Sequence, residues 1–109
     1  MNVLGPPSVT MKNKTYVLDK EYDVELECQV SGMPEVYRVY WMKNNVEINI
    51  QNGNKYDGST TANPSLTVKN MIFSDVGIYH CCAFNNYTTK PTCDNTTLEG
   101  IFITLLYRP

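Results

Sequence analysis

The chain has 109 residues, of which 42% are hydrophobic, and a formal net charge of −2 from nine Lys and Arg against eleven Asp and Glu. This length predicts one domain with a thin core, and this hydrophobic fraction excludes a disordered chain. The small and mixed charge argues against nucleic acid as a partner, and no apolar run approaches the roughly 20 residues of a membrane-spanning helix.

Residues 1–109 are expected to form a single domain of a longer parent protein, either membrane-anchored or secreted. Residues 1–5 are interpreted as an expression start or linker, because the segment after Met1 lacks the basic start and long apolar stretch of a signal peptide. Residues 108–109 are interpreted as the beginning of an interdomain linker.

Two features favour the secretory pathway and an extracellular or cell-surface location. The chain contains an even number of cysteines, which permit three pairings: Cys28, Cys81, Cys82 and Cys93. Three N-glycosylation sequons begin at Asn13, Asn86 and Asn95. A single sequon is weak evidence because the tripeptide arises by chance, but sequons and paired cysteines together indicate an oxidising compartment.

Short strands separated by turn residues are expected along the chain. Alternation is clearest over residues 22–30, where Val24, Leu26 and Cys28 share one face and charged residues share the other, as in a half-buried strand. The remaining strands are expected over residues 7–18 (broken near 12–13), 36–43, 46–50, 55–61, 65–70, 77–84 and 101–107. Residues 85–97 are expected to form a long polar loop, and residues 71–75 one helical turn. This pattern predicts an all-β fold, an antiparallel sandwich or barrel.

One motif is more specific than the strand pattern. Trp41 follows Cys28 at short range, and Cys81 ends the sequence Asp-x-Gly-x-Tyr-x-Cys over residues 75–81. This arrangement resembles the immunoglobulin superfamily, which implies a Greek-key, two-sheet β-sandwich. Residues 28–34 and 65–70 also resemble the I-set subgroup. Residues 46–61 leave room for at most a C′ and a D strand, which is short for a V-type domain with its extra hairpin, so the I-set is the first choice and a shortened V-type domain the alternative.

The resemblance implies a structural core. A Cys28–Cys81 disulfide would join the two sheets, with Trp41 packed against it. Leu66 points inward from the strand over residues 65–70. These residues are expected to be structural and not to form a binding site.

The resemblance also implies a polar corner before strand F. Tyr79, two residues before Cys81, would form a tyrosine corner with its hydroxyl bonded back to the chain near Asp75. Lys55, at the start of strand D, would pair with Asp75.

Cys82 departs from the family pattern. Adjacent strand residues face opposite ways, so Cys82 points outward if Cys81 points inward. Its expected partner is Cys93, in the loop between strands F and G. The resulting bridge would either hold a recognition loop rigid or merely stabilise a long hairpin.

Strand parity brings aromatic, Met and Arg side chains to the outward face of strands C, C′, F and G, whereas the other sheet shows a charged face. The expected partner-binding residues are Arg38, Tyr40, Met42, His80, Phe84 and Phe102. In the same alternation Tyr37 shares the inward side with Val39 and Trp41. Aromatic, Met and Arg residues are favoured at interface centres. We therefore expect this face to contact a protein, either a second copy in a homodimer or a different Ig-type partner, unless a neighbouring domain or the F–G loop covers it.

These expectations favour a binding domain of a cell-adhesion or recognition receptor over other classes. One alternative is an innate immune or antigen-receptor-like domain that recognises ligand with the disulfide-linked F–G loop. Another is an intracellular I-set module of muscle proteins, against which the cysteines and sequons argue. We expect no enzyme, cofactor, metal or small-molecule substrate, because His80, the only histidine, has no nucleophile placed beside it and the cysteine spacing fits no zinc site.

Overall fold

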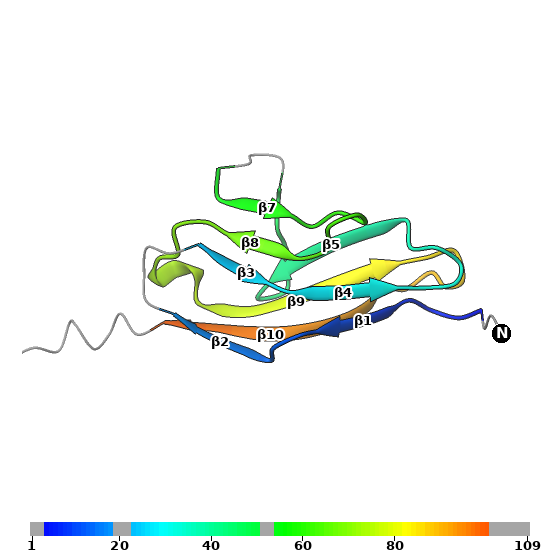
Figure 1. Cartoon of the computed structure of the whole chain (residues 1–109), viewed down its shortest axis with the longest axis horizontal. Coiled ribbons are helices and arrows are strands. Elements are labelled where there is room, and N and C mark those ends of the chain that lie inside the picture. Colours follow the sequence, from blue (N-terminus) through cyan, green and yellow to red (C-terminus); the bar gives the residue numbers. More distant parts are fainter. Residues whose placement is uncertain (1–3, 19–22, 51–53, 101–109) are drawn as a thin grey trace, which may run out of the picture.

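The computed structural model describes residues 4–18, 23–50 and 54–100 (Figure 1). The strands are β1 (Ser8–Met11), β2 (Thr15–Leu18), β3 (Val24–Leu26), β4 (Cys28–Ser31), β5 (Arg38–Lys43), β6 (Val46–Glu47), β7 (Tyr56–Gly58), β8 (Leu66–Val68), β9 (Gly77–Phe84) and β10 (Thr92–Gly100). One 3-10 turn, η1 (Phe73–Asp75), precedes β9.

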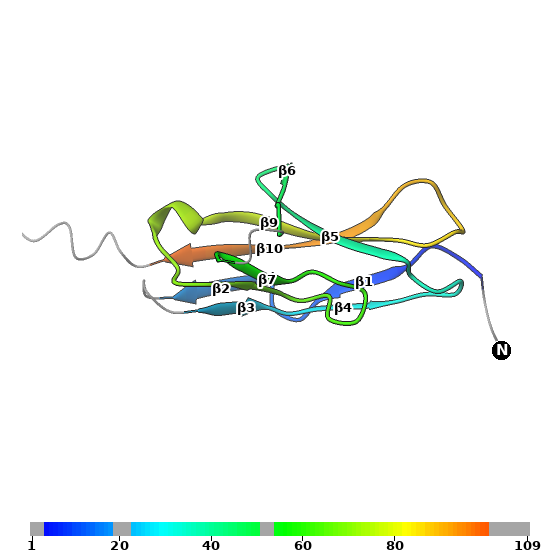
Figure 2. The same ribbon diagram turned by 90° about the horizontal axis from the view of Figure 1, so that it is seen from above.

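The strands stack in two layers, with β9 and β10 on one side and β3 and β4 on the other (Figure 2). One layer is the five-stranded sheet β2-β10-β9-β5-β6. The other is formed by the pair β1-β4 and the three strands β3-β8-β7, with β3 and β4 consecutive along the chain. This architecture confirms the predicted all-β sandwich.

The first strand changes sheets where the sequence predicts a break. β1 pairs with β4 in one layer, whereas β2 runs parallel to β10 in the other. The intervening residues 12–14 are exposed. The Thr96 hydroxyl donates to the Asn13 carbonyl across 2.8 Å, which holds the crossing segment against β10.

The core is built around the disulfide that joins the layers. Cys28 of β4 and Cys81 of β9 are bonded, as predicted, and both are buried. Trp41 lies opposite Cys81 on β5, belongs to the same core cluster and is fully buried. Its indole N–H donates to the Pro64 carbonyl at 2.7 Å, which satisfies the one polar atom that the ring buries. Leu66 of β8 is also fully buried, as expected.

The predicted corner before β9 is present. The Tyr79 hydroxyl donates to the Asp75 backbone carbonyl at 2.6 Å, and burial raises the pKa of Tyr79, with smaller contributions from Tyr56 and Asp75. Lys55 Nζ lies 2.6 Å from Asp75 Oδ2, which also accepts the Ile72 N–H at 2.8 Å. The buried carboxylate is therefore both paired and hydrogen-bonded, as a buried charge requires.

The prediction of a polar loop over residues 85–97 is wrong for its second half, since β10 begins at Thr92. The sequence did not predict this strand because its inward residues are not all apolar: Thr96 is buried together with Leu98. Cys93 therefore lies in a strand and not in a loop. The strand predicted over residues 101–107, and with it Phe102, lies outside the described residues.

Replacing Tyr79 by Phe removes a buried hydroxyl and leaves the Asp75 carbonyl without its donor. We expect the free energy of unfolding to fall by about 1–2 kcal/mol, measured by urea denaturation. Tyr87→Phe, at a side chain that is 55% exposed, is the control and should change little. Equal effects of the two substitutions would contradict the corner's structural role.

Candidate protein-binding face

The outward side of the five-stranded sheet, here called the β5–β9–β10 face, has a defined register. Between β5 and β9, Arg38 is paired with Phe84, Tyr40 with Cys82, and Met42 with His80. Between β9 and β10, Cys82 is paired with Cys93 and His80 with Asn95. Paired residues on neighbouring strands project to the same side of a sheet. The structure therefore brings together on one face the predicted contact residues Arg38, Tyr40, Met42, His80 and Phe84; the sixth, Phe102, lies outside the described residues.

An aromatic cluster lies at one end of this face. We define it as Tyr37, Arg38, Tyr40 and Phe84. Phe84 stacks against both tyrosines, with ring centroids 6.2 Å from Tyr37 and 6.0 Å from Tyr40. The Arg38 guanidinium lies 4.6 Å from the centroid of Tyr40 and 5.8 Å from that of Phe84. Stacking of this kind fixes a long side chain in place while leaving its donors available.

The inward assignment of Tyr37 is wrong. Val39 and Trp41 are buried, but the Tyr37 side chain is 57% exposed. The reason is that β5 begins at Arg38, so Tyr37 precedes the regular alternation and turns toward Phe84.

Glu47 of β6 supplies the opposite charge beside the cluster. Its carboxylate lies 2.9 Å from an Arg38 guanidinium nitrogen, and both side chains are about half exposed. Such an exposed pair contributes little stability, so its consequence is orientation of Arg38. An open depression of about 390 Å³ adjoins the pair and is also lined by Tyr40, Ile48 and Ile50.

His80 and Met42 occupy the middle of the face, where both are half-buried. His80 Nδ1 is buried and, among the described residues, has no hydrogen-bond partner. The neighbouring Cys82 is bonded to Cys93, so no thiolate stands beside the imidazole. In the described ranges no group of His, Cys, Asp and Glu side chains could hold a metal ion.

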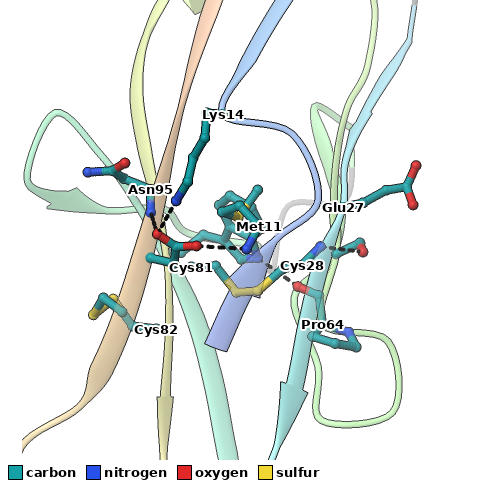
Figure 3. Close-up of a disulfide and its surroundings, with 12 residues drawn as sticks. Met11, Lys14, Glu27, Cys28, Pro64, Cys81, Cys82 and Asn95 are labelled. Carbon is teal, nitrogen blue, oxygen red and sulfur yellow. Dashed lines mark hydrogen bonds and ion pairs between the residues drawn. A yellow bond between two sulfur atoms is a disulfide. The ribbon is translucent and has the colours of Figure 1, made fainter. Parts of the chain in front are cut away.

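The second disulfide lies on this face. Cys82 and Cys93 are directly paired in register, with Cα atoms 4.1 Å apart. Figure 3 shows Cys81 turned toward Cys28 while Cys82 points away from the core, as strand alternation predicts. The predicted pairing is confirmed, but the bridge joins two paired strands instead of holding a loop.

A residue that sequence reasoning missed organises the turn between β9 and β10. Asn85 is fully buried, and its Nδ2 donates to the Gly5 and Pro34 carbonyls at 2.9 Å each. Its Oδ1 accepts the Tyr87 N–H at 3.0 Å. One amide thus ties this turn to the N-terminal segment at the same end of the domain (Figure 1). The sequence signal that could have indicated its burial was strand alternation, since Asn85 continues the inward series of Tyr79, Cys81 and Ala83.

Asp94, like Asn85, connects segments that are far apart in the sequence, in this case β10 and the segment around β1. Its carboxylate accepts the Met11 N–H at 2.8 Å, the Lys14 ammonium at 2.5 Å and the Asn95 N–H at 2.9 Å (Figure 3). Burial by itself raises the pKa of Asp94, but these hydrogen bonds and the Lys14 charge outweigh it, and the pKa lies below its usual range.

The three sequon asparagines are all exposed but differ in position. Asn13 lies between β1 and β2, and Asn86 lies in the turn after β9. Asn95 lies within β10 and not, as expected, at the end of a loop. Figure 3 shows its side chain on the same side of the sheet as Cys82.

A family model described as immunoglobulin domain matches residues 6–85, so the chain belongs to the immunoglobulin domain family. Synaptogenesis protein syg-1 of Caenorhabditis elegans is 33% identical over 90 residues, which are 78% of this chain and 12% of that protein. Striated muscle preferentially expressed protein kinase of Danio rerio is 29% identical over 96 residues, which are 88% of this chain and 3% of that protein. The chain thus spans a small part of the curated relatives it matches.

Solved structures agree on the fold. A crystal structure of Dpr2 Ig1-Ig2 in complex with DIP-Theta Ig1-Ig3 matches with a TM-score of 0.76 and 26% identity, covering 90% of this chain and 33% of the matched chain.

Within the described ranges no helix is long and apolar enough to cross a membrane.

The two disulfides should contribute unequally to stability. Replacing Cys28 and Cys81 by Ala releases residues 53 apart in sequence, which costs about 4 kcal/mol in the chain-entropy estimate. Replacing Cys82 and Cys93 releases residues only 11 apart, with an upper limit of about 3 kcal/mol, and backbone pairing already holds these strands. Urea unfolding of both double variants measures the difference, and a larger loss from the second pair would contradict this assignment.

Asp94 should make stability depend on pH. A carboxyl whose pKa is lower in the folded state stabilises above its unfolded pKa of about 3.9, and this contribution is lost as pH falls through the folded pKa. We expect Asp94→Ala to cost about 2 kcal/mol at neutral pH, and the difference from the parent chain to shrink below about pH 4. Urea denaturation across pH measures it, with the exposed Glu25→Ala as control. A pH-independent difference would contradict the role of the charge.

Proposed function

We propose that this chain is an extracellular immunoglobulin domain of a cell-adhesion or recognition receptor, and that it binds another protein through the β5–β9–β10 face. The observation that carries the proposal is the aromatic cluster, in which Tyr37 and Tyr40 each stack against Phe84 and Arg38 lies over Tyr40; Tyr37 and Arg38 are exposed, and Tyr40 and Phe84 are half-buried. Tyr and Arg are the residue types that most often supply binding energy at protein interfaces.

The relatives support a receptor domain that contacts proteins. Syg-1 is described as a synaptogenesis protein, and the Dpr2 structure is a complex between proteins built from Ig domains. The two disulfides, which pair every cysteine, favour an oxidising compartment over the cytosol. This favours the extracellular assignment over the muscle-type module represented by the Danio rerio relative.

The proposed occupant of the face is a second immunoglobulin domain, in the simplest case a second copy of this chain. A twofold dimer places the same surface patch of both copies together, so the patch must complement itself. Arg38 and Glu47 make the patch self-complementary in charge, because each copy presents one exposed positive and one exposed negative side chain next to each other. On pairing, each copy could offer Glu47 to Arg38 of the other.

The alternative of a disulfide-rigidified recognition loop is less favoured. Cys82 and Cys93 join the strands themselves, and the turn of residues 85–91 is held by Asn85 instead.

Self-association of the bacterially produced, glycan-free domain tests the proposal. We expect a concentration-dependent dimer in sedimentation equilibrium, and a loss of affinity of at least about tenfold on Tyr40→Asp, because a charge would be buried against the partner. Gln29→Asp adds the same charge at an exposed position of β4, in the other layer, and should leave the dimer unchanged. A monomer at millimolar concentration, or equal effects of both substitutions, would contradict the second copy as occupant.

A further inference from the structure

Asn95 is the one sequon asparagine, among the three, that lies inside a strand of the proposed binding face. Its side chain is exposed, and no hydrogen bond joins its amide to the described residues. The Asn95 backbone N–H, by contrast, is bonded to Asp94. The side-chain amide is thus free to carry a substituent without loss of a contact in the fold.

Asn95 stands in a row that crosses the face. It is paired with His80 of β9, which is paired in turn with Met42 of β5. Neighbouring strands are about 4.8 Å apart, so the backbone at Met42 lies roughly 10 Å from that at Asn95. A bulky group on Asn95 is therefore within reach of His80 and Met42.

The aromatic cluster lies further along the same strands. Phe84 is four residues beyond His80 on β9, which at about 3.3 Å per residue is a separation of roughly 13 Å. The β5–β9–β10 face thus has two parts, the row of Asn95, His80 and Met42, and the aromatic cluster with Glu47.

We propose that Asn95 carries an N-linked glycan that covers the row of His80 and Met42 and confines protein docking to the aromatic cluster. The confinement of docking to the aromatic cluster rests on the proposed function, whereas the glycan and its coverage of Met42 do not. The chemistry is transfer from a lipid-linked oligosaccharide diphosphate: the sugar–phosphate bond breaks, a C–N bond forms to Asn95 Nδ2, one amide proton is lost and the lipid diphosphate leaves. Thr97, two residues on, completes the acceptor sequence.

Occupancy can be measured on the chain secreted from eukaryotic cells. Enzymatic release of N-glycans in ¹⁸O-water converts each occupied Asn to a labelled Asp, which peptide mass spectrometry locates. We expect label at Asn95. An unlabelled Asn95 in secreted protein whose Asn13 or Asn86 is labelled overturns the proposal.

Coverage needs a separate readout that does not depend on any partner. Hydroxyl-radical footprinting of the secreted chain should oxidise Met42 several-fold more slowly than in Thr97→Val, which lacks the sequon but keeps a β-branched residue in β10. Tyr37, in the aromatic cluster, should react equally in both. Asn86→Gln, which removes the sequon in the turn, is the matched control and should leave Met42 protected.

Equal oxidation of Met42 with and without a glycan on Asn95 overturns the proposal that the glycan covers Met42. If Thr97→Val is not secreted, enzymatic deglycosylation of the folded parent chain gives the same comparison without a substitution. These outcomes are distinguishable from failure of the proposed function, because self-association is measured on protein without glycans.

Discussion

The bond between Cys28 and Cys81 fixes which side chains of β9 point into the core and which point to the binding face. It joins β4 in one layer to β9 in the other, with Trp41 buried in the same cluster. Side chains alternate along a strand, so fixing Cys81 inward forces His80, Cys82 and Phe84 outward. A slip of one residue would exchange the two sides of β9, which the disulfide and the Tyr79 corner prevent.

Much of this arrangement could be predicted from the sequence. The spacing of Cys28, Trp41 and Cys81 and the motif before Cys81 were sufficient to recognise the resemblance to the immunoglobulin superfamily, and this resemblance implied the fold, the Cys28–Cys81 disulfide and the Lys55–Asp75 pair. They were also sufficient to assign Tyr40 and Phe84 to one face, because parity is a property of the sequence once one residue is known to be buried.

The remaining features depend on tertiary contacts: parity continues the inward series of β9 to Asn85, but it does not identify the distant partners that allow a polar side chain to be buried there. Thr96 reads as polar, yet it is buried because its hydroxyl reaches Asn13 of a distant segment, and this hid β10. Asn85 reads as a turn residue, yet its partners Gly5 and Pro34 come from two other segments. In each case a buried polar group is satisfied by residues far away in sequence, which only the folded chain brings near.

The face that results is partly exposed and already ordered at Arg38, because stacking fixes this side chain before any partner arrives and less conformational entropy is lost on binding. The most direct test of this account is the concentration dependence of backbone amide shifts in NMR spectra of the glycan-free domain. We expect shifts that grow with concentration at Arg38, Tyr40 and Phe84. Shifts confined to Glu25 and Thr67 on the opposite layer, or spectra that do not change up to millimolar concentration, would contradict it.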